Sequence, residues 1–149
     1  MALHWKLTID AADPAAQADF WGEALGYTVE DHSALIEQLR QNGQLPEGST
    51  IRHHNRDAWR DFAAVRHPDD PFEEATGVGL GRRLLFQRVA EGKTVKNRLH
   101  IDVHTEAGRR EAEVARLEGL GATVLYEQKQ PMGSWTTMAD PEGNEYCVE

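Results

Sequence analysis

Residues 96–104 hold the side chains whose types and spacing could do chemistry. Arg98, His100, Asp102 and His104 occupy alternate positions there. In a strand, alternate side chains point to one face, about 6–7 Å apart. An imidazole beside a carboxylate can do acid–base work, so His100 and Asp102 are the catalytic candidates. The row fits a pocket wall and the solvated outer face of an ordinary sheet about equally well.

Two further polar residues, Lys6 and Cys147, join these candidates. Lys6 could bind an anionic ligand or act as a base with a lowered pKa. Its alternative is a polar residue that is salt-bridged to Asp102 or Glu145. Cys147 could act as a nucleophile near Lys6, and its alternative is a small buried residue.

The aromatic residues divide into core and pocket candidates. Trp5, Phe20 and Trp21 lie in patterns that predict burial. Trp59 and Trp135 lie in or beside irregular segments, so they are the better candidates for pocket walls.

Composition narrows the partners and the setting. The chain has 149 residues, which predicts one domain or two tightly joined halves. A net charge of −9 argues against nucleic acid and anionic membranes as partners. The single cysteine excludes an intrachain disulfide and a cysteine cluster for zinc. The side chains of His53, His54 and His67 are expected to be solvated, and their spacing fits no metal motif. We find neither a signal peptide nor a long apolar run, which predicts a cytoplasmic protein.

The elements that must position these residues alternate between strands and helices. Strands are predicted over residues 3–10, 27–30, 58–66, 83–89, 96–104, 122–126, 134–138 and 144–148, and helices over 14–25, 34–40 and 107–120. Asp13 is the expected N-cap of the first helix and Gly26 its C-cap. Leu99 belongs to the apolar face of its strand, which a helix should cover. Residues 44–55 and 128–133 are expected to be loops, and residues 32–80 are the hardest part to interpret.

The chain contains a repeat. Residues 25–29 read Leu-Gly-Tyr-Thr-Val, and residues 120–124 read Leu-Gly-Ala-Thr-Val. Lys6 and His100 precede these two segments at nearly the same spacing. The sequence therefore predicts two copies of a strand–helix–strand–strand–strand module, residues 1–90 and 96–149. Two half-covered sheets would turn their polar faces toward a shared cavity.

Four parts of the chain carry a resemblance to a known superfamily: Asp13-Pro14 with Phe20-Trp21 and Leu25-Gly26, residues 84–89, residues 96–103 and residues 140–145. Together these segments resemble the vicinal oxygen chelate superfamily, which includes glyoxalase I, bleomycin-resistance proteins and extradiol dioxygenases. The closer resemblance is to small actinobacterial glyoxalase-like domain proteins. The resemblance implies an α+β fold in which paired βαβββ modules form one domain, residues 1–149, with a cleft lined by curled mixed sheets.

In metal-dependent members of the superfamily, four strand positions supply the ligands, and these fall on Lys6, Gln87, His100 and Cys147. Only His100 keeps the usual ligand type, although Gln87 could be a weak oxygen ligand. The Lys6 ammonium would repel a divalent ion, and carboxylate-type sites prefer hard oxygen donors to a thiolate. The resemblance thus implies a small-molecule cleft without the usual metal and without another cofactor.

Three functions remain open. The first is a metal-independent small-molecule site, in a binding protein or an enzyme, within one chain or shared across a homodimer. Its catalytic residues would be Lys6, His100 and Asp102, and its ligand-binding residues Gln87, Arg98, Trp59, Trp135, Glu145 and Cys147. The second is a metal-dependent lyase, isomerase or dioxygenase of the glyoxalase I type. The third is a cleft filled by side chains in a protein that acts through association.

Overall fold

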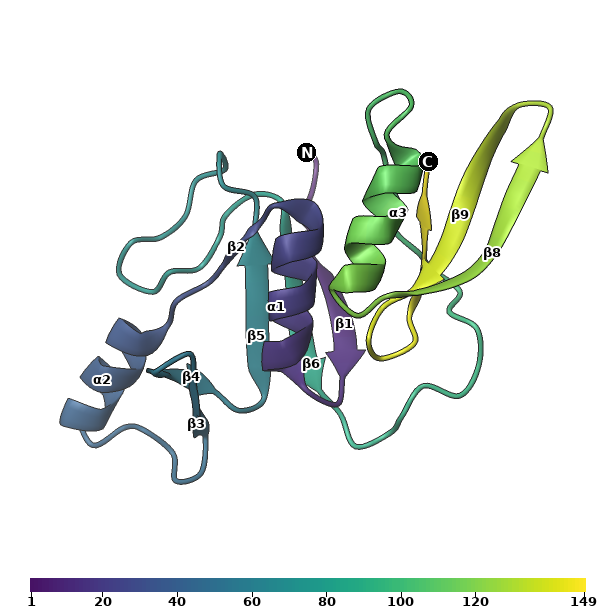
Figure 1. Ribbon diagram of the computed structural model, residues 1–149. Coiled ribbons are helices and arrows are strands. Elements are labelled where there is room, and N and C mark those ends of the chain that lie inside the picture. Colours follow the sequence, from purple (N-terminus) through teal and green to yellow (C-terminus); the bar gives the residue numbers. More distant parts are fainter. The chain divides into compact units, whose positions relative to one another are not determined.

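The computed structural model describes residues 1–149 (Figure 1). The chain forms two compact units, Met1–Glu91 and Gly92–Glu149. The first unit contains β1 (Leu7–Ala11), α1 (Pro14–Leu25), β2 (Thr28–Val29), α2 (Ser33–Gln41), β3 (Thr50–His53), β4 (Arg56–Trp59), β5 (Phe62–Arg66) and β6 (Arg83–Arg88). The second contains β7 (Asp102–Val103), α3 (Arg110–Gly119), β8 (Thr123–Gln130), β9 (Gly133–Ala139) and β10 (Glu145–Val148). The predicted α+β class is confirmed.

Both units build a four-stranded mixed sheet with the same connectivity. The strand orders are β1-β6-β5-β2 and β7-β10-β9-β8. In the first sheet β1 runs parallel to β6, and in the second β7 runs parallel to β10. The other neighbours are antiparallel. The second unit is a plain βαβββ module, whereas the first carries an insertion, α2 with the β3–β4 hairpin, between its second and third strands.

Helix α1 begins and ends where the sequence predicts. The Asp13 side chain accepts a hydrogen bond from the Ala16 amide at 3.1 Å, and Gly26 ends the helix in the left-handed region with φ of 66°. The helix lies along the sheet of the first unit (Figure 1) and buries Phe20 and Trp21. Burial of one such aromatic side chain contributes about 1.5–3 kcal/mol. No helix has the length and apolar character that a membrane crossing needs.

Substitution of the cap tests this account of α1. We expect Asp13→Ala to lower the free energy of unfolding by about 1 kcal/mol, because the Ala16 amide loses its acceptor at the helix start. Asp13→Asn keeps an acceptor oxygen and should stay close to wild type. Urea unfolding followed by circular dichroism measures both, and equal losses in the two variants would contradict the capping role.

The second unit has one apolar and one polar sheet face. Tyr146 and Val148 of β10 are buried with Met138 of β9 and Leu117 of α3. Residues of β10 alternate between a buried and a half-buried face, and this alternation turns Cys147 to the face opposite Tyr146 and Val148. The β8–β9 hairpin extends beyond the rest of this sheet (Figure 1).

The long strand predicted over residues 96–104 is wrong, because only Asp102–Val103 forms a strand. Ahead of it the chain follows side-chain contacts: the Asn97 amide donates to Glu145 Oε2 at 3.0 Å. Leu99, expected under a helix, is 78% exposed. The alternating pattern is present in the sequence, but β10 pairs with β7 only at Cys147 and Val148.

The first strand is shorter than predicted for a similar reason. It begins at Leu7, which pairs with Leu84 near the start of β6. Residues 1–6 have no such pairing, and Trp5 is 85% exposed. The expectation that Trp5 belongs to the core is wrong, whereas the same expectation for Phe20 and Trp21 is confirmed.

Three further expectations are corrected in polar segments. Residues 44–55 contain β3, the strand predicted over 58–66 is divided into β4 and β5, and residues 128–133 belong mostly to the β8–β9 hairpin. The residues of β3 and β4 and residues 128–133 are all exposed or half-buried, so these segments lack a strongly apolar alternating face. Their structure comes from hairpin pairing, which composition alone does not show.

Candidate functional site

The register of the second sheet assembles a polar row across three strands. Asp102 of β7 lies opposite Cys147 of β10, and Cys147 lies opposite Thr137 of β9. Trp135 precedes Thr137 by one full period of side-chain alternation, so it shares this face. The face is therefore built by sequence alternation in β9 and β10 and by pairing with the short β7.

A hollow of about 320 Å³ lies over this face. Ten residues line it: Lys96, His100, Asp102, Tyr126, Trp135, Thr137, Glu145, Tyr146, Cys147 and Glu149. They combine aromatic surface with one amine, one imidazole and three carboxylates. Small-molecule sites have volumes of roughly 300–1,000 Å³, so this hollow has room for one small metabolite.

The side chains of His100 and Asp102 lie in contact at the edge of the hollow. His100 Nε2 lies 3.3 Å from Asp102 Oδ1, and both side chains are nearly half exposed. Solvent screens a pair of this kind, so its contribution to stability is small. The pair stays open toward the hollow, where a ligand could exchange a proton with it.

Glu145 is held as a carboxylate at the edge of the hollow. It accepts hydrogen bonds from Lys93 Nζ at 2.9 Å and from the Asn97 amide at 3.0 Å. Burial alone would raise the pKa of Glu145, but these two donors lower it to about 2. Its lysine partner within the second unit is Lys93. Lys6 is exposed just before β1 in the first unit.

The Cys147 thiol is half-buried, and its Sγ lies 3.7 Å from Thr137 Oγ1. Burial raises the pKa of Cys147, and the neighbouring Asp102 carboxylate raises it further, against the lowering effect of Thr137. The thiol is therefore protonated at neutral pH. This favours the small half-buried residue over the nucleophile among the two readings of Cys147.

His100, Asp102 and Cys147 also form a group of metal-ligand type. Their ligand atoms all lie within 4.8 Å of one another. Zinc takes imidazole, carboxylate and thiolate ligands, and three protein ligands leave one position open. The set fits zinc and does not fit a hard, oxygen-seeking ion, because only Asp102 offers a carboxylate.

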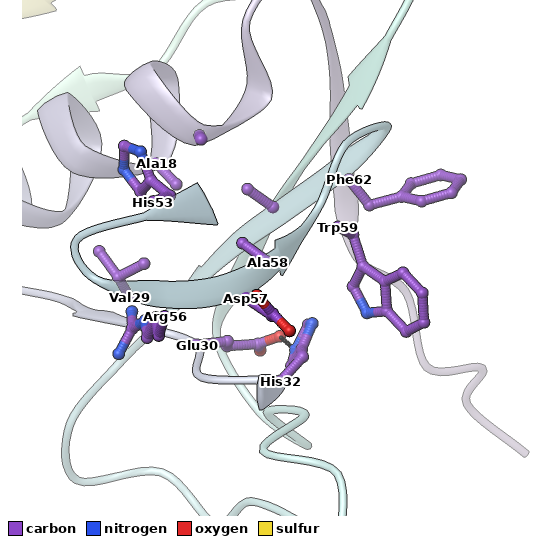
Figure 2. A pocket seen from close by; sticks show the side chains of 12 residues that line it. Ala18, Val29, Glu30, His32, His53, Arg56, Asp57, Ala58, Trp59 and Phe62 are labelled. Atoms are coloured by element: carbon purple, nitrogen blue, oxygen red, sulfur yellow. Dashed lines mark hydrogen bonds and ion pairs between the residues drawn. The ribbon is translucent and has the colours of Figure 1, made fainter. Parts of the chain in front are cut away.

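The other predicted site residues are not among the ten that line this hollow. Gln87 is exposed on β6 and lines an open hollow of about 560 Å³ in the first unit, with Asp61 and Phe62 among its neighbours. Trp59 lines a small pocket of about 30 Å³ beside Glu30, where Figure 2 shows it at one end. Arg98 is exposed and lines none of these hollows.

The two units differ in strand register at the four positions that the resemblance assigns to metal ligands. Cys147 lies opposite Asp102, two residues after His100. Gln87 lies opposite Asp10, four residues after Lys6. The spacing from the shared motifs matches Lys6 to His100 and Gln87 to Cys147. The offset between the two positions is nevertheless four residues in the first unit and two residues in the second.

Two groups of residues at these sites were not identified from the sequence. Five unpredicted residues line the hollow: Lys96, Tyr126, Thr137, Tyr146 and Glu149. The period-two spacing of Thr137 from Trp135 is the signal that could have identified Thr137. His53 and His54, expected as solvated loop residues without a metal grouping, lie in or beside β3 and share one carboxylate partner. His54 is an exposed turn residue, as expected, whereas His53 belongs to β3 and is half-buried. Their shared partner comes from α1, far away in the sequence.

Comparisons with known proteins agree with this fold. Residues 6–149 match the family model of the glyoxalase-like domain. No curated protein matches the chain. A possible glyoxalase from Bacillus cereus is 18% identical with a TM-score of 0.58, over 99% of this chain and 98% of that one.

Two further solved structures are similar. A glyoxalase/bleomycin resistance protein/dioxygenase family enzyme from Burkholderia phytofirmans PsJN is 13% identical with a TM-score of 0.59, over 96% of this chain and 94% of that one. The fosfomycin resistance protein FosX from Mesorhizobium loti is 9% identical with a TM-score of 0.61, over 100% of this chain and 91% of that one. Identities this low show the fold alone. By its family match and its fold, the chain belongs to the glyoxalase-like domain family of the vicinal oxygen chelate superfamily.

Proposed function

We propose that the hollow of the second unit binds a small aromatic or anionic metabolite without a metal ion. The observation that carries this proposal is the hollow itself, which combines the Trp135 ring with the Lys96 and His100 side chains. An aromatic wall supplies apolar contact, and a small number of polar groups fixes the orientation of a ligand. Lys96 and His100 would face a negative group of the metabolite.

Any reaction in this site would use the His100–Asp102 pair. Asp102 orients the imidazole through the 3.3 Å contact, and His100 is then placed to take up or release a proton of the bound molecule. The protonated Cys147 thiol is a contact surface in this proposal. The contributions of Lys6, Gln87, Arg98 and Trp59 stay predictions, as do the cytoplasmic location, the homodimer and a cavity shared by both modules.

A metal-dependent lyase, isomerase or dioxygenase is the second candidate. The observation that favours it is the convergence of His100, Asp102 and Cys147. Zinc bound there would act as a Lewis acid toward an oxygen of the substrate. The fosfomycin resistance protein from Listeria monocytogenes is described as complexed with Mn(II), but manganese prefers oxygen ligands and the donors here include a thiol.

A thermal-shift panel of small aromatic and anionic metabolites tests the first candidate. A compound at 100 times its Kd stabilises the native state by about 2.7 kcal/mol, which raises Tm by several degrees. We expect Trp135→Ala to abolish the shift that wild type shows. Trp5→Ala is the matched control, since Trp5 is exposed and lines none of the hollows described.

The same panel separates the two candidates when it is run with EDTA and with one equivalent of ZnCl2. Metal-independent binding predicts the same shift under both conditions, whether or not metal binds elsewhere in the protein. A shift that needs zinc and disappears in Cys147→Ser would favour the metal-dependent enzyme. A Tm shift that persists fully in Trp135→Ala would show that the compound does not bind in this hollow.

A further inference from the structure

Two histidines of the inserted β3–β4 hairpin share one carboxylate of α1. His53 Nε2 and His54 Nε2 each lie 2.8 Å from the same atom, Asp19 Oδ2. The two imidazole rings are 4.1 Å apart between centroids. The ligand atoms of all three residues lie within 4.8 Å of one another, so three groups of metal-ligand type converge on one point.

The hairpin turn makes this convergence possible. Adjacent residues of a regular strand point to opposite faces, which would separate the two rings. Here His54 and Asn55 adopt positive φ values of 47° and 62°, as in the tightest hairpin turns, and His53 pairs with Arg56 across the turn. The change of backbone direction at His54 brings its ring to the same side as His53.

We propose that Asp19, His53 and His54 bind a divalent transition-metal ion of the zinc type. Imidazole suits zinc, copper, nickel and iron, and two histidines with one carboxylate are a recurrent three-ligand set. Tetrahedral zinc with ligands at about 2.0–2.1 Å would separate the ligand atoms by about 3.3 Å. The present 2.8 Å contacts would therefore have to lengthen by about half an ångström, which side-chain rotation allows.

The site is accessible and has room for further ligands. The side chains of Asp19, His53 and His54 are 33%, 26% and 64% exposed. His53 also lines the small pocket of about 30 Å³, beside Ala18 of α1 (Figure 2). Water or a ligand group can therefore complete the coordination, as at zinc sites with three protein ligands.

The metal would hold the insertion against the module to which it is attached. The segment from α2 to β4 has no counterpart in the second unit, and β3 and β4 pair only with each other. A bond through the ion would join this hairpin to α1 across 34 residues of sequence. This site is independent of the proposed function, because its residues lie in the first unit and outside the hollow over β7, β10 and β9.

Calorimetric titration of the EDTA-treated protein, residues 1–149, with ZnCl2 tests the proposal. It is done in the Cys147→Ser background, so that the second possible group, His100 with Asp102 and Cys147, loses its thiol. We expect one equivalent to bind and Tm to rise. Removing a residue that only hydrogen-bonds to a metal ligand lowers metal affinity about 10–100-fold. His54→Ala removes a ligand itself, so it should weaken zinc binding at least tenfold.

Two further variants separate coordination from a plain hydrogen-bonded cluster. Asp19→Asn keeps an acceptor for the imidazoles but loses the charged ligand, so apo stability should change little while zinc affinity falls at least tenfold. His104→Ala removes an exposed histidine that pairs with Glu149 and should leave affinity unchanged. The proposal is overturned if zinc does not bind at micromolar concentration, or if it binds His54→Ala and Asp19→Asn as well as the parent.

Discussion

Glu30→Gln is expected to destabilise the protein by about 3–5 kcal/mol, because it removes one partner of a buried ion pair and leaves the other uncompensated. The Glu30 side chain is 0% exposed and that of Arg83 is 9% exposed. Arg83 donates from Nε at 2.6 Å and from Nη2 at 2.8 Å. His32 and the Gly79 amide complete the contacts of Glu30, at 3.0 Å and 2.8 Å.

The pH dependence of this effect follows from the pKa of Glu30. Burial alone would raise it, but hydrogen bonds from Arg83, His32 and the Gly79 amide lower it from 4.5 to about 2. A carboxyl whose pKa is depressed in the folded state stabilises the protein above its unfolded pKa. The stability difference between wild type and Glu30→Gln should therefore be full above pH 4.5 and shrink as the pH falls toward 2.

Urea unfolding at pH 7 and at pH 3 measures both predictions. Glu37→Gln is the matched control, because Glu37 pairs with Arg40 on the exposed surface of α2. Surface pairs contribute little, so this control should unfold close to wild type. Equal midpoints for Glu30→Gln and Glu37→Gln at pH 7 would show that burial of the Glu30–Arg83 pair has no energetic consequence.

The fold was predictable where local signals agree with packing. The Asp13 cap and Gly26 define α1 in the sequence, and the structure places both ends of the helix there. The alternation in residues 144–148 predicts which face of β10 is buried. The Leu-Gly repeat predicts two modules with the same element order, and the two four-stranded sheets have matching strand orders. The superfamily follows from these segments, whereas an actinobacterial origin stays a prediction.

Strand lengths and the insertion were not predictable, because they depend on partners distant in sequence. Residues 96–101 alternate like a strand, yet Asn97 is bound to the turn before β10 instead. Polar segments such as β3 and β4 become strands only by pairing with each other. Tertiary pairing overrides local β-propensity in both cases.

The candidate site shows the same division. Period-two spacing identifies His100 with Asp102 and Glu145 with Cys147, and the structure brings all four to one hollow. The group of Asp19, His53 and His54 has no signal of this kind, because its members are brought together by the packing of a hairpin on a helix. Short-range spacing predicts a site within one sheet far better than a site between separate elements.

Asp140→Ala should have the second large effect, on both stability and the hollow. Asp140 is buried, and its Oδ1 accepts hydrogen bonds at 2.9 Å from the backbone amides of Glu142 and Asn144. Asn144 Nδ2 donates to Asp140 Oδ2 at 3.0 Å. Each buried donor left without a partner costs about 1–3 kcal/mol, so we expect a loss of about 3 kcal/mol in the free energy of unfolding.

The effect should reach the hollow because this turn leads directly into β10. Asn144 Oδ1 accepts from Asn97 Nδ2, and Glu145 holds the Asn97 amide, so the turn also fixes the segment that carries His100. Loosening it should expose the Cys147 thiol, which a thiol-reactive dye would detect as faster labelling under native conditions.

Asp140→Asn keeps an oxygen for the two backbone amides and should retain most of the stability and the slow labelling. If Asp140→Ala labels as slowly as wild type while its unfolding midpoint falls, the turn stabilises the module without positioning the site. Faster labelling in Asp140→Ala but not in Asp13→Ala, whose effect lies in α1, would instead show that the turn before β10 controls access to the hollow.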